Sequence, residues 1–279
     1  MCGIAGFKKL HSYHTKKDCT DLINKMNSTL QHRGPDADGT YVTKEITLGH
    51  RRLSIIDIEG GTQPMSLPNK SLTVTFNGEI YNYKELRNEL LSHGCKFKTN
   101  SDTEVLLHAY KIFGIDFIHK LDGMFAFGLW DNKKKTLILA CDPFGQKPLY
   151  YCENKGIFYF TSELKALKHI PQFNYSIDNL ALQQYLCYEY IPSPRTMYNK
   201  IHKLEAGHFL TVNTSIKKHS YWNFKINEQS PLYKCSEKDL LIELDNLIKN
   251  AVKKRLLSDV PLGVFLSGGI DSSLITAYM

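Results

Sequence analysis

The chain opens with Met1-Cys2-Gly3-Ile4-Ala5-Gly6-Phe7, a short apolar stretch with a cysteine in second position. Removal of Met1 would leave Cys2 with both a thiol and a free α-amine. A thiol with a pKa of about 8.5 reacts mainly as its thiolate, and an α-amine with a pKa of about 8 is the nearest base that can take its proton. The stretch therefore predicts a nucleophile and its base on one residue. A small buried residue at the start of an edge strand is the alternative interpretation.

Length and charge limit what the rest of the chain can be. The chain has 279 residues, of which 42% are hydrophobic, so two domains and a sizeable core are expected. The formal net charge is +7, but basic residues occur singly or in short groups such as Lys133-Lys134-Lys135, so we expect no nucleic-acid partner. No stretch is long enough to span a membrane, and the N-terminus lacks the regions of a signal peptide. We therefore expect a cytoplasmic protein without a membrane partner.

The cysteines agree with that location. Seven cysteines, at positions 2, 19, 95, 141, 152, 187 and 235, form an odd set with no CxxC pair and no regular spacing. In a reducing compartment we expect free thiols that pack as small hydrophobic residues. Their spacing identifies no metal ligands, so the sequence leaves the metal ligands unknown.

Short strand-like runs dominate the first two hundred residues, and a few helices interrupt them. The expected strands are residues 4–8, 46–56, 72–76, 124–130, 136–141 and 156–161. Apolar residues at helical spacing predict a helix that ends near Leu30. Asn82 with Glu85, and Ser101 with Glu104, predict capping boxes at the start of two more helices. Strands grouped with a few helices indicate a layered α+β fold.

The sequence changes character after Trp222. Residues 227–238 are polar and read as a linker, so the expected domains are 2–226 and 227–279. Leucines from Leu240 to Leu256 then predict an amphipathic helix. The apolar run 261–266 has the length and composition of a buried parallel strand.

A serine- and glycine-rich string, Ser267-Gly268-Gly269-Ile270-Asp271-Ser272-Ser273, follows that run. A strand that turns into a helix here would place several backbone amides at a helix N-terminus, where an anion is favoured. Glycine lets the backbone approach a ligand closely. The string therefore predicts a phosphate site, although the GxxxxGK[ST] pattern of the common P-loop is absent. A serine-rich turn without a ligand is the alternative.

The same string resembles the PP-loop of ATP pyrophosphatases, which release pyrophosphate from ATP. The resemblance implies ATP and Mg²⁺ as cofactors and the first strand and loop of an α/β domain. The residues that it assigns to ATP are Leu266, Ser267, Gly268, Gly269, Asp271 and Ser272.

Six ordered motifs make nearly the whole chain resemble the glutamine-dependent asparagine synthetase family. They are MCGIAG, His32-Arg33-Gly34-Pro35-Asp36, Arg52-Leu53-Ser54-Ile55-Ile56-Asp57, Phe76-Asn77-Gly78-Glu79-Ile80-Tyr81-Asn82, Ser101-Asp102-Thr103-Glu104 and Asp142-Pro143-Phe144-Gly145-Gln146-Lys147-Pro148-Leu149-Tyr150-Tyr151. The resemblance implies that the first domain is a class II glutamine amidotransferase. Its fold would be the N-terminal-nucleophile sandwich, with four layers in the order αββα.

The resemblance assigns catalysis to three residues. The Cys2 thiolate would attack the side-chain amide of glutamine, and negative charge would develop on the amide oxygen. Donors must already point at that oxygen, and by resemblance they are the Asn77 side chain and the Gly78 backbone amide. Without the resemblance, Asn77-Gly78 reads as a type I′ hairpin turn.

The resemblance also assigns the binding of glutamine. Arg52 would bind the α-carboxylate in bidentate fashion, and Glu79 and Asp102 would bind the α-ammonium group. The residues that follow Arg52 in its motif complete the implied binding set, and they are Leu53, Ser54, Ile55 and Ile56.

Arg33 and Asp36 lie in a loop rich in glycine and proline. We expect them to order the pocket, and a plain turn with a surface ion pair explains them equally well.

The implied overall reaction uses glutamine, aspartate and ATP. ATP would activate aspartate as β-aspartyl-AMP, and ammonia from glutamine would displace AMP. Because the family continues well beyond its PP-loop, we expect this chain to show glutaminase activity at most, and a homodimer remains open. Two alternatives are a PP-loop amidotransferase for another carboxylate acceptor and a non-catalytic remnant that binds glutamine.

Overall fold

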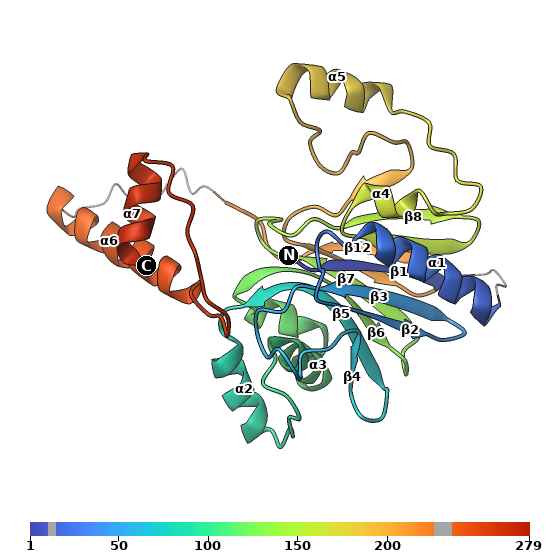
Figure 1. Ribbon diagram of the computed structural model, residues 1–279, viewed down its shortest axis with the longest axis horizontal. Helices are drawn as coiled ribbons and strands as arrows, with labels where there is room; N and C mark the ends of the chain where they lie inside the picture. Colours follow the sequence, from blue (N-terminus) through green and yellow to red (C-terminus); the bar gives the residue numbers. More distant parts are fainter. Residues whose placement is uncertain (11–14, 226–235) are drawn as a thin grey trace.

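The computed structural model describes residues 1–10, 15–225 and 236–279. Two antiparallel sheets of six strands each pack face to face within this part of the chain, and helices cover their outer faces (Figure 1). Most of the linker expected over 227–238 lies outside the described residues, and its last two residues already belong to α6(Glu237–Lys254). No described helix combines the length and apolarity that a bilayer crossing requires.

The first sheet carries the N-terminal strand near its centre. Its strand order is β10(Ile201–Lys203), β8(Tyr150–Asn154), β9(Ile157–Thr161), β1(Gly3–Lys9), β3(Ile46–Arg52) and β2(Ala37–Val42). Helices α1(Lys16–Thr29) and α4(Leu164–Leu167) cover its outer face. Apolar side chains such as Phe7, Ile23 and Leu167 form the layer between this sheet and these helices. Cys2 therefore directly precedes a central strand, not an edge strand.

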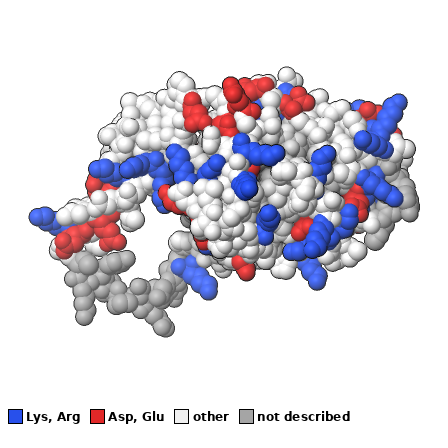
Figure 2. Space-filling view, turned by 90° about the horizontal axis from the view of Figure 1, so that it is seen from below, with Lys and Arg blue, Asp and Glu red and all other residues white. Residues whose placement is uncertain are grey.

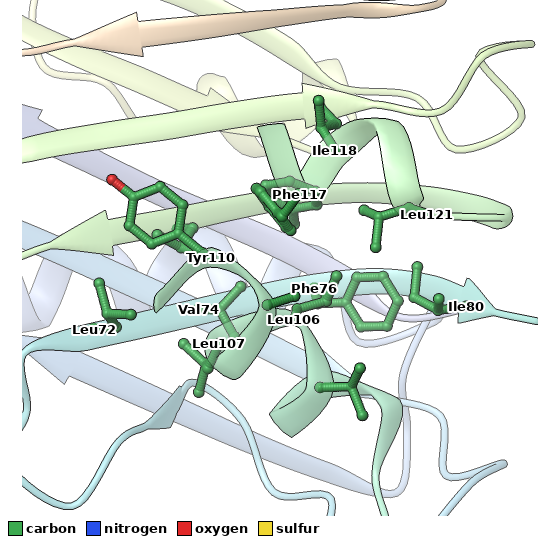
Figure 3. Close-up of a cluster of buried hydrophobic side chains, with 14 of the residues drawn as sticks. Leu72, Val74, Phe76, Ile80, Leu106, Leu107, Tyr110, Phe117, Ile118 and Leu121 are labelled. Atoms are coloured by element: carbon green, nitrogen blue, oxygen red, sulfur yellow. The ribbon is translucent and has the colours of Figure 1, made fainter. Parts of the chain in front are cut away.

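The second sheet contains β5, the strand that carries Asn77, Gly78 and Glu79. Its order is β12(Ile216–Ser220), β11(His208–Val212), β7(Thr136–Cys141), β6(Gly123–Asp131), β5(Leu72–Ile80) and β4(Met65–Ser66). Helices α2(Tyr83–Ser92), α3(Asp102–Phe113) and η1(Gly114–Lys120) cover its outer face. Figure 3 shows the β5 side chains Val74, Phe76 and Ile80 beside Leu106 and Phe117 of these helices.

Residues along β5 alternate between the helix layer and the sheet-sheet interface, because successive side chains of a strand point to opposite faces. Val74 and Phe76 pack against the helices, whereas the Thr75 hydroxyl bonds the Gly49 carbonyl of the opposite sheet at 3.0 Å. Asn77 has the same parity as Thr75. Its side chain therefore points between the two sheets, where Cys2 lies.

A third apolar layer fills the space between the sheets. It joins Ile4, Leu48 and Phe160 of one sheet to Trp130 and Leu210 of the other. Three apolar layers separate four layers of secondary structure, so the expected αββα sandwich is confirmed.

Charge contributes little to this architecture. Figure 2 shows Lys and Arg side chains spread over one face in several groups with Asp and Glu among them. Exposed ion pairs of the protein include Lys120–Glu89 at 2.8 Å and Lys254–Asp122 at 2.6 Å. Exposed pairs of this kind stabilise a protein by roughly 1 kcal/mol or less, so the apolar layers hold the fold together.

Two expected strands have different limits. The strand expected over 46–56 ends at Arg52, because the chain then turns and its carbonyls accept hydrogen bonds from the Arg52 side chain. The strand expected over 72–76 continues to Ile80. Asn77 and Gly78 pair with Ala126 and Phe125 of β6, so the hairpin-turn interpretation is wrong.

The two expected capping boxes form only in part. Asn82 is the N-cap of α2, but its side chain bonds Lys120 O and Asp122 N instead of the helix. Ser101 caps α3 by accepting from Thr103 N. The Glu104 carboxylate is engaged elsewhere, by backbone amides of the preceding loop.

The C-terminal part projects from the sandwich. Helices α6 and α7(Ile270–Tyr278) lie to one side of it, and α5(Asn179–Tyr188) projects separately (Figure 1). The buried strand expected over 261–266 is wrong, because the run is exposed and unpaired among the described residues. A strand needs a hydrogen-bonding neighbour, and none of the described strands reaches this run.

Candidate active site

A cavity of about 280 Å³ opens at the end of the sandwich where β1 begins. Most of the residues predicted for catalysis and glutamine binding line it. Those residues are Cys2, Arg52, Leu53, Ile55, Ile56, Asn77, Gly78, Glu79 and Asp102. Ser54 does not line the cavity, and its amide instead donates to Asp36 Oδ2 at 2.8 Å. Asp36 therefore contacts the loop that follows Arg52, and a role of Asp36 in ordering the pocket stays a prediction.

The Cys2 thiol lies against the backbone of Leu53. Leu53 N donates to Sγ at 3.4 Å, and Sγ donates to Leu53 O at 3.6 Å. Burial raises the pKa of the Cys2 thiol, while the Leu53 amide, the terminal ammonium and Arg52 act in the opposite direction. A nearby base is therefore needed to form the thiolate at neutral pH. Burial also lowers the pKa of the terminal amine at Met1, which favours the neutral, basic form.

A buried guanidinium group holds the main chain of Cys2. Arg33 Nε donates to Cys2 O at 2.9 Å, and Nη1 donates to Glu163 Oε1 at 2.9 Å. Although burial opposes it, hydrogen bonds from Arg33, His32 and Lys165 lower the pKa of Glu163 to about 2. The carboxylate therefore stays charged and pairs with Arg33, whose other hydrogen bond holds the Cys2 carbonyl.

The Asn77 side chain offers a donor without a partner. Its Nδ2 atom is buried and has no hydrogen-bond partner among the residues that the structure describes. Buried donors are rarely left unpaired, because the desolvation of an unpaired amide costs about 1–3 kcal/mol. Since Asn77 lines the cavity beside Cys2, its Nδ2 is available to a ligand oxygen.

The Gly78 amide points to the same cavity edge. Alternate amides of a strand face the same side, and its neighbours Phe76 N and Ile80 N bond Gln63 Oε1 and Asp102 Oδ2 there. Phe125, which lies opposite Gly78, uses its own N and O on Asp142. The Gly78 N–H is thus a second donor that faces the cavity.

Two carboxyl groups supply the acidic part of the cavity. Asp102 is the first residue of α3 and is 4% exposed. Burial is the largest cause that raises the pKa of Asp102 to about 7, and Glu79 adds to it, whereas the Ile80 amide opposes it. Burial also raises the pKa of Glu79, and Lys147 opposes that rise. Both groups favour a cationic ligand that would restore their negative charge.

Arg52 is partly engaged within the protein. Nη1 donates to Ile58 O at 2.6 Å, and Nη2 donates to Ile56 O at 3.1 Å and Asp57 O at 2.6 Å. Within the part of the chain that the structure describes, one N–H of Nη1 and the Nε–H have no acceptor and remain for a ligand. Arg52 therefore shapes the loop 56–58 in addition to lining the cavity, and its binding of a carboxylate stays a prediction.

Sequence reasoning assigned no role to Lys147 and Gln63, which also line the cavity. The Lys147 side chain is buried, and burial lowers the pKa of its ammonium group while Glu79 opposes this. Gln63 bonds Phe76 N at 2.7 Å and Thr103 Oγ1 at 3.3 Å. Lys147 belongs to a recognised motif, so its place in that motif was the available signal.

The predicted phosphate loop forms a turn and a helix. Ser267 and Ser272 lie side by side, with their hydroxyl oxygens 2.9 Å apart, and Gly268 adopts a φ of 83° that favours glycine. The loop leads into α7, and its residues are exposed except Ser272, which is partly buried. Among the described residues no group of three or more His, Cys, Asp or Glu could hold a metal ion. ATP binding by this loop stays a prediction.

Comparison with known families covers most of the chain. The glutamine amidotransferase domain family matches residues 1–222, and the asparagine synthase family matches residues 243–279. The chain belongs to the glutamine amidotransferase domain family. The family resemblance predicted from the six motifs is thereby confirmed.

Curated relatives agree with this membership. An asparagine synthetase [glutamine-hydrolyzing] 1 of Bacillus subtilis is 42% identical over 281 residues, which is 99% of this chain and 43% of the relative. A putative asparagine synthetase [glutamine-hydrolyzing] 2 of Methanocaldococcus jannaschii is 36% identical over an alignment that covers 100% of this chain and 57% of the relative. The chain thus spans about half the length of these relatives.

Solved structures confirm the amidotransferase fold. A glutamine phosphoribosylpyrophosphate amidotransferase from B. subtilis superposes with a TM-score of 0.59 and 20% identity, over 99% of this chain and 63% of that chain. The allosteric regulatory enzyme of purine biosynthesis gives the same TM-score over 81% of this chain and 50% of that chain, with 21% identity. At this identity the likeness concerns the fold alone.

Proposed function

We propose that the cavity hydrolyses glutamine to glutamate and ammonia, with Cys2 as the nucleophile. The observation that carries the proposal is the pair of free donors, Asn77 Nδ2 and Gly78 N, beside the Cys2 thiol. Such a pair suits the oxyanion that forms when a thiolate attacks an amide carbon. The resemblance to glutamine-hydrolysing relatives supports glutamine as the amide.

The proposed reaction has two steps. The α-amine of Cys2, freed by removal of Met1, takes the thiol proton, and the thiolate adds to the amide carbon. The C–N bond then breaks, the amine returns the proton to the leaving nitrogen, and ammonia departs. Water next attacks the γ-glutamyl thioester, releases glutamate and restores the thiol. Arg33 keeps the Cys2 carbonyl in place throughout.

The charges of the cavity orient the substrate. Glu79 and Asp102 would bind the α-ammonium group, which returns both carboxyl groups to their ionised form. The free N–H groups of Arg52 would bind the α-carboxylate. Opposite charges at two places in the cavity would distinguish glutamine from simple amides.

We also propose that the longer protein transfers this ammonia to an activated aspartate and forms asparagine. The relatives' names and the match of residues 243–279 support this role. In it, Ser267, Gly268, Gly269, Asp271 and Ser272 would hold the phosphates of ATP with Mg²⁺, and Leu266 would lie near the adenine. A helix N-terminus with two adjacent hydroxyl groups suits phosphate oxygens. Bound ATP would supply the adenylate that activates the acceptor carboxylate. Another carboxylate acceptor is the alternative.

The proposed domains are 2–226 for glutamine hydrolysis and 227–279 for the start of the ATP-dependent part. A homodimer is a further proposal.

We also propose a reducing compartment such as the cytoplasm, because all cysteines that the structure describes are free thiols. These are Cys2, Cys19, Cys95, Cys141, Cys152 and Cys187.

Steady-state release of ammonia from glutamine tests the hydrolysis. We expect turnover by the wild-type chain, loss of at least about a thousandfold in Cys2→Ala, and an intact mass that lacks Met1. Cys187→Ala is the matched control, because Cys187 is an exposed thiol far along the chain on α5. Turnover that survives in Cys2→Ala would exclude Cys2 as nucleophile. Glutamine binding without any turnover would favour the non-catalytic alternative.

A further inference from the structure

We propose that Asp259, which lies outside the amidotransferase match, is a positioning residue of the glutamine pocket. The inference rests on the proposed function, because it concerns how tightly that pocket binds glutamine. It adds a residue from the second matched segment, 243–279, to a site otherwise built from residues before 150.

Asp259 makes two hydrogen bonds with one wall of the cavity. Its Oδ2 accepts from Asp57 N at 2.7 Å, and its own amide donates to Ile55 O at 2.9 Å. Ile55 lines the cavity. The C-terminal segment therefore fastens the backbone of the loop 55–57 on both sides of Ile56.

Asp57 passes this constraint to both ends of the pocket. Its carboxylate accepts from Gly60 N at 3.0 Å and from Asn100 N at 2.8 Å, and its carbonyl accepts from Arg52 Nη2. Asn100 lies two residues before Asp102, one of the two carboxyl groups in the cavity. Asp57 thus links, through its carbonyl and its carboxylate, the residues proposed for the carboxylate and for the ammonium group of glutamine.

Asp57 needs such support because its backbone is strained. Its φ is 49°, in the left-handed region that side-chain-bearing residues adopt at a cost. The hydrogen bond that Asp57 N donates to Asp259 Oδ2 supports this conformation from the second matched segment. Loss of this acceptor would free the loop to leave this conformation and would widen the pocket around Arg52.

The contact between α6 and the sandwich offers a matched control. Lys254 forms an ion pair with Asp122 at 2.6 Å on the same side of the sandwich, and neither residue lines the cavity. Lys254→Ala therefore weakens the docking of α6 without touching the loop 55–57. Both Asp259 and Lys254 are exposed, so neither substitution removes a core side chain.

The experiment measures KM and kcat for glutamine hydrolysis by the full 279-residue chain. Asp259→Ala should raise KM by about tenfold, equivalent to the loss of the one side-chain hydrogen bond to Asp57 N, and leave kcat within about twofold. Asp259→Asn should restore the wild-type KM, because its amide oxygen still accepts from Asp57 N. Lys254→Ala should match wild type, and thermal unfolding should show that all three variants are folded.

Two outcomes overturn the proposal: an unchanged KM in Asp259→Ala, or an equal rise in Lys254→Ala, which would show that general docking is responsible. Calorimetric binding of glutamine to Cys2→Ala, with and without Asp259→Ala, separates this inference from the proposed function. If wild type does not turn over but Cys2→Ala binds glutamine, the ratio of the two dissociation constants still decides the role of Asp259. Absence of both turnover and binding overturns both proposals.

Discussion

Asn77 carries a sharp prediction at the scale of the single residue. Asn77→Ala removes the unpaired Nδ2 donor, so the oxyanion loses one of its two hydrogen bonds. We expect kcat for glutamine hydrolysis to fall by about 10²–10³-fold with KM nearly unchanged, because this bond strengthens only as charge develops. The measurement is steady-state ammonia release, and Asn69→Ala, in a surface turn, is the control. If kcat falls by less than about threefold, Asn77 does not donate a hydrogen bond to the oxyanion.

Asp102 gives the site a pH dependence. Its pKa in the free protein is raised to about 7, and only the ionised form attracts the ammonium group of glutamine. As the pH falls below 7, a growing fraction of the protein must release a proton to bind, so KM should rise about tenfold per pH unit. Above pH 8 this effect should vanish. In Asp102→Asn the KM should be high and should lack this dependence, and a profile identical to that of wild type would contradict the assignment.

The same residues show how far sequence reasoning reaches. Cys2, Asn77 and Asp102 were predictable because each falls in a motif with a defined chemical task. Lys147 lies in the motif of residues 142–151, but the sequence predicts no role for it, because a lysine without a known partner is usually a solvated surface charge. The bonds from Arg52 to the loop 56–58 were beyond prediction, because they depend on where three carbonyl groups lie after the loop has folded.

At the scale of the element, Gly78 decides how closely β5 and β6 approach. A Cβ at this position would lie 2.1 Å from Met124 O and 2.7 Å from Phe125 Cα, both backbone atoms that cannot move aside cheaply. We expect Gly78→Ala to lower the free energy of unfolding by about 1–3 kcal/mol. Gly263→Ala is the matched control, because a Cβ there meets nothing within 4 Å.

Urea unfolding, with a constant slope m, gives the comparison between the two alanine variants. Equal midpoints would show that the strands separate easily at Gly78. Ammonia release by the same preparations would then report whether the Gly78 amide still serves the oxyanion.

Element prediction failed where a local pattern had two physical meanings. Asn77-Gly78 suits a two-residue turn, yet both residues lie inside β5 because the apolar alternation continues to Ile80 and β6 pairs with the whole length. The run 261–266 has the residues of a buried strand, but burial requires neighbours on both faces. Among the described elements it has none, so composition alone gave the wrong state.

At the scale of the whole molecule, the sandwich and the C-terminal part differ in how much they bury. Apolar side chains of β5, β6 and α3 are buried in the layer beneath the helices, and β6 also contributes to the layer between the sheets. In the two C-terminal helices, by contrast, Val252 is the one buried residue among those that the structure describes. Large apolar side chains such as Phe265 and Ile270 are almost fully exposed. Opening of α7 therefore exposes little new surface, while opening of β6 requires global unfolding.

Amide hydrogen exchange should report this difference directly. We expect amides of α7 to exchange at least about a thousandfold faster than those of β6, since their opening free energies lie at the two ends of the range for native proteins. Helix α3 is the matched control, because it is also helical but nine of its residues are buried, and it should be as protected as β6. Measurements at two protein concentrations identify self-association through the exposed apolar side chains, which would slow exchange in α7 only at the higher concentration. If α7 amides exchange less than about tenfold faster than β6 amides at the lower concentration, the expectation is wrong. Contacts of α7 itself would then stabilise the C-terminal helices, in addition to the burial of Val252 on α6.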